Sequence, residues 1–184
     1  MEALNDLVRL GKVRYIGASS MFTWQFAKAQ AIAEKRGWAK FVSMQNFYNL
    51  AYREEEREMN PYCKDSNVAL IPWSPLARGT LTHSSQTTRA QTDWFRTMTL
   101  PPLVQEANNQ IAAAVETIAT KHNATKAQIC LAWLFAKGVT SPILGISKIE
   151  YIDDLAGSWK VKLGDEDIKI LEDGYVPRQI WGHS

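Results

Sequence analysis

Two hydrophobic periods alternate along this chain, and their alternation restricts the fold more than any other feature of the sequence. Short, β-branched apolar runs are followed by longer stretches in which apolar residues recur every three or four positions. Segments of these two kinds in regular succession are typical of a parallel sheet with helices packed outside it. The pattern therefore predicts an α/β fold built from consecutive βα units.

Four segments are predicted to be strands, at residues 13–18, 41–44, 68–73 and 139–144. Helices are predicted at residues 2–10, 23–37, 53–64, 103–122, 125–138, 148–156 and 165–175. Thr23 is placed to cap the second helix, and Thr125 with Gln128 forms a capping box for the fifth. Gly11 and Gly138 stand where a helix ends in a left-handed residue.

Each predicted helix carries an apolar stripe that is expected to face the core. The residues expected in these stripes are Leu4, Leu7, Val8, Phe26, Ala27, Gln30, Ala31, Met59, Cys63, Ala107, Ile111, Ala114, Val115, Ile118, Ile129, Ala132, Trp133, Ala136, Ile149, Ile152, Leu155, Ile168 and Leu171. By contrast, the run Glu54, Glu55 and Glu56 is interpreted as a solvated helix face rather than an acid/base pair.

The number of βα units leaves two architectures open. One is an open, doubly wound sheet, and the other is part of a (β/α)₈ barrel. Four units cannot close a barrel of eight, which usually takes about 250 residues, and the chain has 184. Four strands would also leave two open sheet edges, through which self-association is expected.

Composition restricts the class of protein. The chain is 46% hydrophobic and 22% charged, and its net charge of +2 is too small to indicate a nucleic-acid or membrane partner. Cys63 and Cys130 lack C-x-x-C spacing, and His83, His122 and His183 lack metal-ligand spacing, so no metal site is expected. Without a secretory signal, a long apolar run or a disulfide framework, we expect a cytoplasmic protein with reduced cysteines.

The residues that follow the predicted strands have a coherent chemistry. Ser19, Ser20 and Gln45 are neutral hydrogen-bonding groups suited to a carboxamide or a sugar, and Trp73 offers a flat face for stacking. Residues 74–79 form a turn-rich segment with an arginine, and Ser147 and Lys148 open a helix, where anions are favoured. Because ligands bind at the carboxyl ends of parallel strands, one dinucleotide is able to use all four places.

Other motifs for nucleotide or acyl chemistry are absent from the sequence. It contains no G-x-G-x-x-G, no G-x-x-x-x-G-K-[ST] and no G-x-S-x-G. The pattern therefore gives no dinucleotide fingerprint, no P-loop and no nucleophile elbow.

The strand-end segments together resemble the aldo-keto reductase family. The segments that carry the resemblance are 7–20 (LVRLGKVRYIGASS), 43–50 (SMQNFYNL), 71–79 (IPWSPLARG) and 141–148 (SPILGISK). They look like the fifth to eighth strands of the family's barrel, and their details look most like its aryl-alcohol-dehydrogenase-like, fungal-type branch. The resemblance implies that residues 1–184 form one partial oxidoreductase domain, the C-terminal half of a TIM barrel with four parallel βα units.

The resemblance also implies binding of NADP(H). By family position, Ser19, Ser20 and Gln45 would hold the nicotinamide carboxamide, and Trp73 would stack on the nicotinamide ring. The residues implied to line the pyrophosphate are Ser74, Leu76, Arg78 and Gly79.

At the adenosine end, the resemblance implies that Gly145, Ser147 and Lys148 meet the 2′-phosphate. Tyr151 and Asp154 stand where the family has its adenine contacts, although Tyr151 departs from the usual pattern. The expected preference for NADP(H) therefore rests mainly on Lys148.

The family's catalytic Asp, Tyr, Lys and His come from its first four strands, so the resemblance assigns no catalytic residue here. Tyr15, Tyr48 and Tyr52 do not occupy the catalytic position. We expect an oxidoreductase by descent, acting on a small carbonyl or alcohol substrate when completed, and truncated to an inactive cofactor-binding half. The alternatives are a non-catalytic nucleotide-binding or regulatory protein and a gene remnant. Residues 77–102 are interpreted either as a lid over the cofactor or as a disordered insert.

Overall fold

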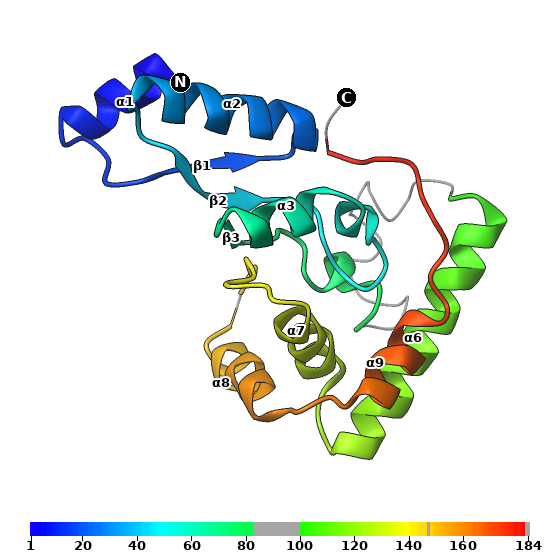
Figure 1. Ribbon diagram of the computed structural model, residues 1–184. Helices are drawn as coiled ribbons and strands as arrows, with labels where there is room; N and C mark the ends of the chain where they lie inside the picture. The colour runs from blue at the N-terminus through cyan, green and yellow to red at the C-terminus, as the bar shows by residue number, and fades with distance from the viewer. Residues whose placement is uncertain (83–99, 147, 183–184) are drawn as a thin grey trace.

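A parallel sheet with helices beside it forms the centre of the molecule. The computed structural model describes residues 1–82, 100–146 and 148–182. Within these ranges the sheet contains β1 (Ile16–Ser19), β2 (Phe41–Gln45) and β3 (Ala69–Leu70), in the order β1-β2-β3. α2 (Thr23–Arg36) connects the first two strands, and α3 (Met59–Asp65) precedes the third (Figure 1). The predicted α/β class with a parallel sheet is confirmed.

The fourth predicted strand, residues 139–144, is not a strand in the described structure, so the four-strand prediction is not confirmed. This segment lies parallel to β3 but pairs through a single bridge between Trp73 and Ile143. The Ile143 N–H donates to the Pro72 carbonyl at 2.9 Å. The Ser141 and Ile143 N–H groups both donate toward the chain at 70–72, but Pro72 has no N–H to donate in return, which interrupts the ladder. The described sheet therefore has three strands, with the fourth segment beside it.

One face of the sheet is buried under helices. Phe26 of α2 is fully buried, stacks on Phe41 of β2 with ring centroids 5.7 Å apart, and meets the ring of Tyr62 from α3 edge-on. Gln30 completes the contact, because its amide both donates to and accepts from the backbone of Phe41 at 2.9 Å. The strand residues buried on this face are Ile16, Ala18, Met44 and Leu70.

The opposite face of the sheet carries small side chains. The strand register aligns Gly17 with Ser43, and Ser43 with Ala69. A Cβ atom on Gly17 would collide with the Ser43 hydroxyl, so glycine permits the close approach of β1 and β2. Gly17 and Ser19 are exposed, and this face is not covered by any described helix.

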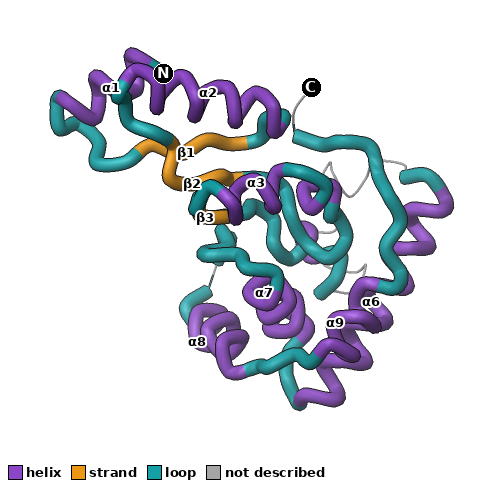
Figure 2. Tube along the Cα trace, viewed as in Figure 1, coloured by secondary structure: helices purple, strands orange, loops and turns teal. Residues whose placement is uncertain are grey.

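The second half of the chain is a group of packed helices (Figure 2). α6 (Pro102–His122) packs against α7 (Lys126–Ala136) and α9 (Asp165–Glu172). The predicted capping box of α7 is confirmed: the Gln128 N–H donates to Thr125 Oγ1 at 3.2 Å, and the Thr125 N–H donates to Gln128 Oε1 at 3.0 Å. Most predicted core residues of these helices are buried, but Ala114 and Ile168 are half-buried and Ala136 is exposed.

The apolar faces of two helices, α1 and α8, are more exposed than predicted. α1 (Glu2–Arg9) ends before a left-handed Gly11, as predicted, but Leu7 is 38% exposed. α8 (Glu150–Ala156) leaves Ile149 and Ile152 exposed by 80% and 51%. The prediction that these two isoleucines are buried is wrong, because no described element packs on that side of α8.

Local details of α2 and the segment before α3 also differ from the prediction. The N-cap of α2 is Phe22 rather than Thr23, and its N–H donates to Gln25 Oε1 at 3.0 Å. Ala31 is exposed rather than packed. The helix predicted at 53–64 is divided into a 3₁₀ turn, Glu54–Glu56, and α3, whose first turn contains Pro61.

The buried aromatic contact on α2 gives a test of the fold. We expect Phe26→Ala to lower the free energy of unfolding by about 3–5 kcal/mol, the scale of a phenylalanine removed from a packed core. The matched control is Trp24→Ala on the same helix, where the tryptophan is 62% exposed. Urea unfolding followed by circular dichroism measures both. Equal midpoints for the two variants would contradict the packing described here.

Candidate functional site

The carboxyl ends of β1 and β3 meet at one edge of the sheet, where polar side chains gather. Trp73 Nε1 donates to Ser20 Oγ at 3.4 Å, and the hydroxyls of Ser19 and Ser20 lie 3.3 Å apart. Ser20 has a left-handed backbone with φ of 43°, which turns the chain away from β1 directly after the strand. The structure therefore brings together three of the residues that the sequence predicted to contact one ligand.

Gln45 and Asn46 complete this edge from β2. Ser19 Oγ donates to the Gln45 backbone carbonyl at 2.7 Å, while the Gln45 side-chain amide makes no hydrogen bond to a described residue. Asn46 is buried, and its Oδ1 accepts from the Ser20 N–H at 3.3 Å. Its Nδ2 donates to Glu55 Oε2 at 2.7 Å. Asn46 thus connects the end of β1 to a buried carboxylate.

A tight turn follows Trp73. Ser74, Ala77, Arg78 and Gly79 have φ values of 52°, 48°, 55° and 85°, and the last three form the 3₁₀ turn Ala77–Gly79. Asn49, which is fully buried, holds this turn by donating from Nδ2 to the Ser74 carbonyl at 3.0 Å. The turn is closed by its own hydrogen bonds, because the N–H groups of Ala77 and Gly79 donate to the carbonyls of Ser74 and Leu76 at 3.0 and 2.9 Å.

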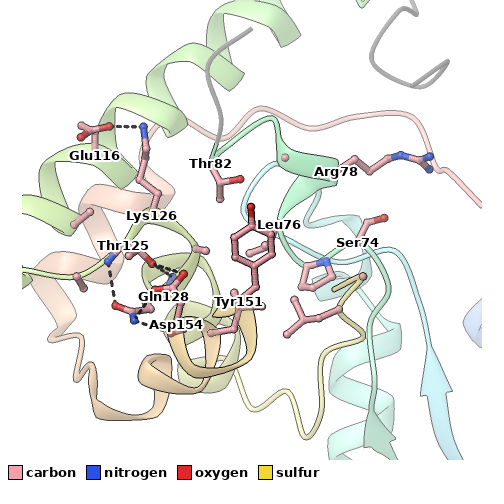
Figure 3. A pocket seen from close by; sticks show the side chains of 18 of the residues that line it. Ser74, Leu76, Arg78, Thr82, Glu116, Thr125, Lys126, Gln128, Tyr151 and Asp154 are labelled. Atoms are coloured by element: carbon pink, nitrogen blue, oxygen red, sulfur yellow. Dashed lines mark hydrogen bonds and ion pairs between the residues drawn. The ribbon is translucent and has the colours of Figure 1, made fainter. Parts of the chain in front are cut away.

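The turn forms one wall of a cavity of about 1210 Å³ (Figure 3). The opposite walls come from α6, α7 and α8. A cavity of this volume is large enough for an extended ligand. The predicted cofactor-binding residues that line it are Ser74, Leu76, Arg78, Gly79, Gly145, Tyr151 and Asp154.

Polar contacts between α7 and α8 hold one end of this cavity. Gln128 Nε2 donates to the Asp154 carbonyl at 2.7 Å and to Asp154 Oδ1 at 3.1 Å. Lys126, which sequence reasoning did not select, also lines the cavity and forms an ion pair with Glu116 at 2.5 Å. In Figure 3 the Tyr151 ring projects between these contacts and Leu76, whereas the Arg78 guanidinium extends away from Tyr151.

The predicted 2′-phosphate residues are only partly placed. Lys148 is exposed, and its Nζ lies 6.0 Å from the centre of the Tyr151 ring. It does not line the cavity, although Tyr151 does. Ser147 lies outside the described residues, as do positions 83–99, to which most of the lid or insert interpretation applies.

The C-terminal segment returns to the strand ends, which the sequence did not indicate (Figure 1). Gly182 has φ of 93°, and a Cβ atom there would lie 3.4 Å from Ser20 Oγ and 3.6 Å from Trp73 Cζ2. The segment is anchored where the Trp181 N–H donates to the Tyr52 hydroxyl at 2.9 Å. Residues near the end of the chain therefore lie beside the predicted nicotinamide contacts.

Glu54 and Glu55 are 9% and 6% exposed, so the interpretation of a solvated glutamate face is wrong. Glu54 Oε1 accepts from the Tyr175 hydroxyl at 2.6 Å and from the Arg178 N–H at 2.8 Å, which anchors the C-terminal segment. Burial alone raises the pKa of Glu54, but hydrogen bonds from Tyr175 and Arg57 outweigh it, and the pKa lies below its usual value. Local periodicity carried no signal for these distant partners.

Glu56 joins a charged network with α7 and α9. Arg53 Nη2 lies 2.8 Å from carboxylate oxygens of both Glu56 and Glu172. Glu172 also accepts from Trp133 Nε1 at 2.8 Å, and Tyr48 donates to Glu56 at 2.6 Å. Burial raises the pKa of Glu56, but the hydrogen bonds from Arg53 and Tyr48 hold it below its usual value.

Glu55 has a different environment from its two neighbours. Burial, reinforced by the nearby charge of Glu54, raises the pKa of Glu55 to about 7. No described cation forms an ion pair with it, and Asn46 is its hydrogen-bond donor. Tyr52 and Cys63, which also feel its charge, have pKa values raised to about 12, mainly by burial, and so stay neutral near pH 7.

Nowhere in residues 1–82, 100–146 and 148–182 do three or more His, Cys, Asp or Glu side chains gather as metal ligands would. None of the helices in these ranges is both long and apolar enough to cross a membrane.

Comparison with known proteins gives a consistent result. Residues 1–175 match the model of the Aldo/keto reductase family. A putative aryl-alcohol dehydrogenase of Schizosaccharomyces pombe is 51% identical over 186 residues, which cover 99% of this chain and 56% of that protein. Versiconal hemiacetal acetate reductase of Aspergillus parasiticus is 47% identical over 183 residues, covering 98% and 53%.

A solved structure gives the corresponding likeness in three dimensions. A thermostable aldo-keto reductase in complex with the inhibitor epalrestat superimposes with a TM-score of 0.71 and 27% sequence identity. The match covers 94% of this chain and 53% of that chain. The chain thus spans about half the length of the relatives it matches.

The buried carboxyl of Glu55 predicts a specific dependence of stability on pH. Its pKa is near 7 in the folded chain and near 4.5 when unfolded. The folded state therefore binds the proton more strongly, and this group's contribution to stability falls as the pH rises from about 4.5 to 7. Glu55→Gln removes this titrating group. We therefore expect the free energy of unfolding of the variant, minus that of wild type, to be larger at pH 8 than at pH 5 by on the order of 3 kcal/mol.

Urea unfolding at the two pH values measures the difference. Glu54 and Glu56 are present in both proteins, so their opposite pH dependence cancels. Glu58→Gln, at an exposed position in the same segment, serves as the control and should show no such change. A difference between Glu55→Gln and wild type that stays constant with pH would contradict the raised pKa.

Proposed function

Because the chain belongs to the aldo/keto reductase family, we propose that its strand-end residues hold NADP(H) for the interconversion of an aldehyde or ketone and an alcohol. One observation carries the proposal. The cluster of Ser19, Ser20 and Trp73 adjoins, through Ser74, a cavity whose volume of about 1210 Å³ is large enough for the rest of a dinucleotide. The names of the fungal relatives favour aryl alcohols or aldehydes as a substrate class.

The residues present fit the proposed cofactor. At the sheet edge, the Gln45 amide and the serine hydroxyls offer both donors and acceptors, as a carboxamide requires. Arg78, which lines the cavity at the turn 77–79, supplies a positively charged side chain for a pyrophosphate. Lys148, on the far side of Tyr151, supplies a positive charge for a 2′-phosphate.

In this proposal the nicotinamide supplies the hydride, and the chain binds and orients it. Trp73 is already stacked on Phe47, with ring centroids 4.4 Å apart, so its ring plane is fixed before any ligand arrives. A fixed plane restricts the nicotinamide to one orientation and reduces the entropy lost on binding. Ser19, Ser20 and Gln45 then select which side of the ring faces the substrate.

The proton donor is proposed to come from outside these residues. Tyr48 and Tyr52 lie near the strand ends, but their hydroxyls are engaged with Glu56 and with the Trp181 N–H. Burial raises the pKa of both phenols. We therefore propose that these 184 residues form the cofactor side of the site and reduce no carbonyl by themselves.

Titration with reduced cofactors tests the proposal. We expect the chain to bind NADPH more tightly than NADH, measured by enhancement of cofactor fluorescence. Trp73→Ala should weaken both by about fivefold, on the scale of one aromatic stacking contact. Lys148→Ala should weaken NADPH alone, by about fivefold, because a partly exposed charge pair contributes about 1 kcal/mol.

Two exposed residues of the 3₁₀ turn Gly157–Lys160 supply the controls for this titration. Trp159→Ala and Lys160→Ala should leave both affinities unchanged. If the wild-type chain binds neither cofactor, the proposal is lost. Equal binding of NADPH and NADH would remove only the preference for NADP(H).

A second candidate, a nucleotide-binding protein that pairs with another copy of itself, is favoured by the exposed apolar ends of the fold. In the described sheet β1 pairs only with β2, so its other edge is open beside Tyr15, which is 75% exposed. Ile149, directly before α8, is 80% exposed. Such surfaces favour association.

Light scattering after size exclusion separates the two candidates. For the pairing candidate we expect a species of twice the 20.8 kDa chain mass. Tyr15→Lys combined with Ile149→Lys should convert it to a monomer, because a lysine at a sheet edge opposes pairing. Ala3→Lys, an exposed change on α1, is the control. A monomeric wild-type chain would exclude pairing.

A further inference from the structure

Glu55 is buried beside the predicted nicotinamide contacts but touches none of them directly. Its carboxylate reaches them through one residue, Asn46, which donates from Nδ2 to Glu55 Oε2 at 2.7 Å. Asn46 is only 3% exposed, and its Oδ1 accepts from the Ser20 N–H at 3.3 Å. Ser20 Oγ in turn accepts from Trp73 Nε1 at 3.4 Å. One chain of hydrogen bonds therefore runs from the buried carboxylate to the stacking ring.

The two ends of the Asn46 amide are chemically different, and this difference gives Glu55 its role. The Ser20 N–H is a donor, so it requires the Asn46 oxygen. An ionised carboxylate is an acceptor only, so it requires the Asn46 nitrogen. If the acceptor at Glu55 is lost, a rotated amide would place its NH₂ group against the Ser20 N–H, where two donors cannot pair.

The orientation of the Asn46 amide matters because the backbone of Ser20 is strained. Its φ of 43° lies in the left-handed region, which a serine adopts only when other contacts compensate for the strain. The Asn46 acceptor is such a contact, and Ser20 Oγ receives Trp73 Nε1–H. A change at Asn46 is therefore transmitted to the positions of both Ser20 Oγ and Trp73.

We propose that Glu55 is a positioning residue for the nicotinamide end of the site, because it fixes the Asn46 amide that holds the Ser20 turn. The proposal rests on the proposed binding of NADP(H). Glu54 and Glu56 do not share this role, since their carboxylates are paired with Arg57, Tyr175 and Arg53. The essential property of Glu55 is an acceptor at this point, whether or not its carboxyl is ionised.

The test compares two ligands that share one end. NADPH contains the nicotinamide, whereas adenosine 2′,5′-bisphosphate carries only the adenosine and 2′-phosphate end. Glu55→Leu keeps the approximate volume but removes the acceptor, so NADPH should bind about tenfold more weakly, the scale of one charge-assisted hydrogen bond. Adenosine 2′,5′-bisphosphate should bind as it does to wild type. Calorimetry on the full chain measures both affinities.

Glu55→Gln is the conservative variant, because its Oε1 can still accept from Asn46 Nδ2. We expect it to restore NADPH affinity to within about twofold of wild type, since the hydrogen bond is retained. The matched controls, Glu58→Leu and Glu58→Gln, change an exposed glutamate three residues away and should affect neither ligand. NADPH affinity that is retained in Glu55→Gln but lost in Glu55→Leu would show that the acceptor matters, and not only the filling of a buried position.

A measurement without cofactor tests the same contact directly. Amide hydrogen exchange by ¹⁵N NMR should show the Ser20 N–H exchanging faster in Glu55→Leu than in wild type or Glu55→Gln. Amides inside α2 should be unchanged if the variant is folded.

Three outcomes would overturn the proposal: equal losses for both ligands in Glu55→Leu, no loss for either, or unchanged exchange at Ser20. Failure of the wild-type chain to bind either ligand would instead refute the proposed function. The exchange of Ser20 would then still decide whether Glu55 fixes the turn.

Discussion

Three consecutive carboxylates hold the parts of this structure in place, and each is partnered in a different direction. Glu54 binds the C-terminal segment through Tyr175 and the backbone of Arg178. Glu55 binds Asn46 at the sheet edge, and Glu56 joins Arg53 in a network with α7 and α9. Burying a charge is costly unless it is paired and hydrogen-bonded. The 3₁₀ turn is therefore stable only when the tail, the sheet edge and the helices are all in position, which couples their folding.

The sequence predicted the gathering of the strand-end residues better than it predicted this turn, for a physical reason. The proximity of strand-end residues such as Ser20 and Trp73 is predictable without knowledge of any distant contact, because parallel pairing alone places the carboxyl ends of the strands at one edge of the sheet. The burial of Glu54 depends on Tyr175, which is 121 residues further along the chain. A run of three acids looks solvated when only its neighbours are considered, since the hydroxyl and N–H groups that pair with it are remote.

The other differences from prediction arise where an apolar pattern lacks a partner or a donor. Residues 139–144 have strand composition, but Pro72 lacks the N–H that would continue the ladder between this segment and β3. Ile149 and Ile152 have the spacing of a buried stripe, yet no described element covers them. Periodicity identifies which side of an element is apolar. It does not supply the surface against which that side is buried, so the exposed ends of this chain were not predictable from the pattern.

The two ends of the proposed site differ in how their groups are held, and this difference assigns them different tasks. Around Ser20 and Trp73 the groups are fixed by buried residues, including Asn46 and Glu55, so this end is able to define orientation. At the other end Lys148 is exposed, and its contribution is an attraction that salt screens over about 8–10 Å. Hydride transfer requires the reacting ring to be placed closely, whereas the distant phosphate only has to be retained. In the proposed complex, the buried hydrogen bonds therefore lie where geometry matters, and the exposed charge lies where affinity alone is needed.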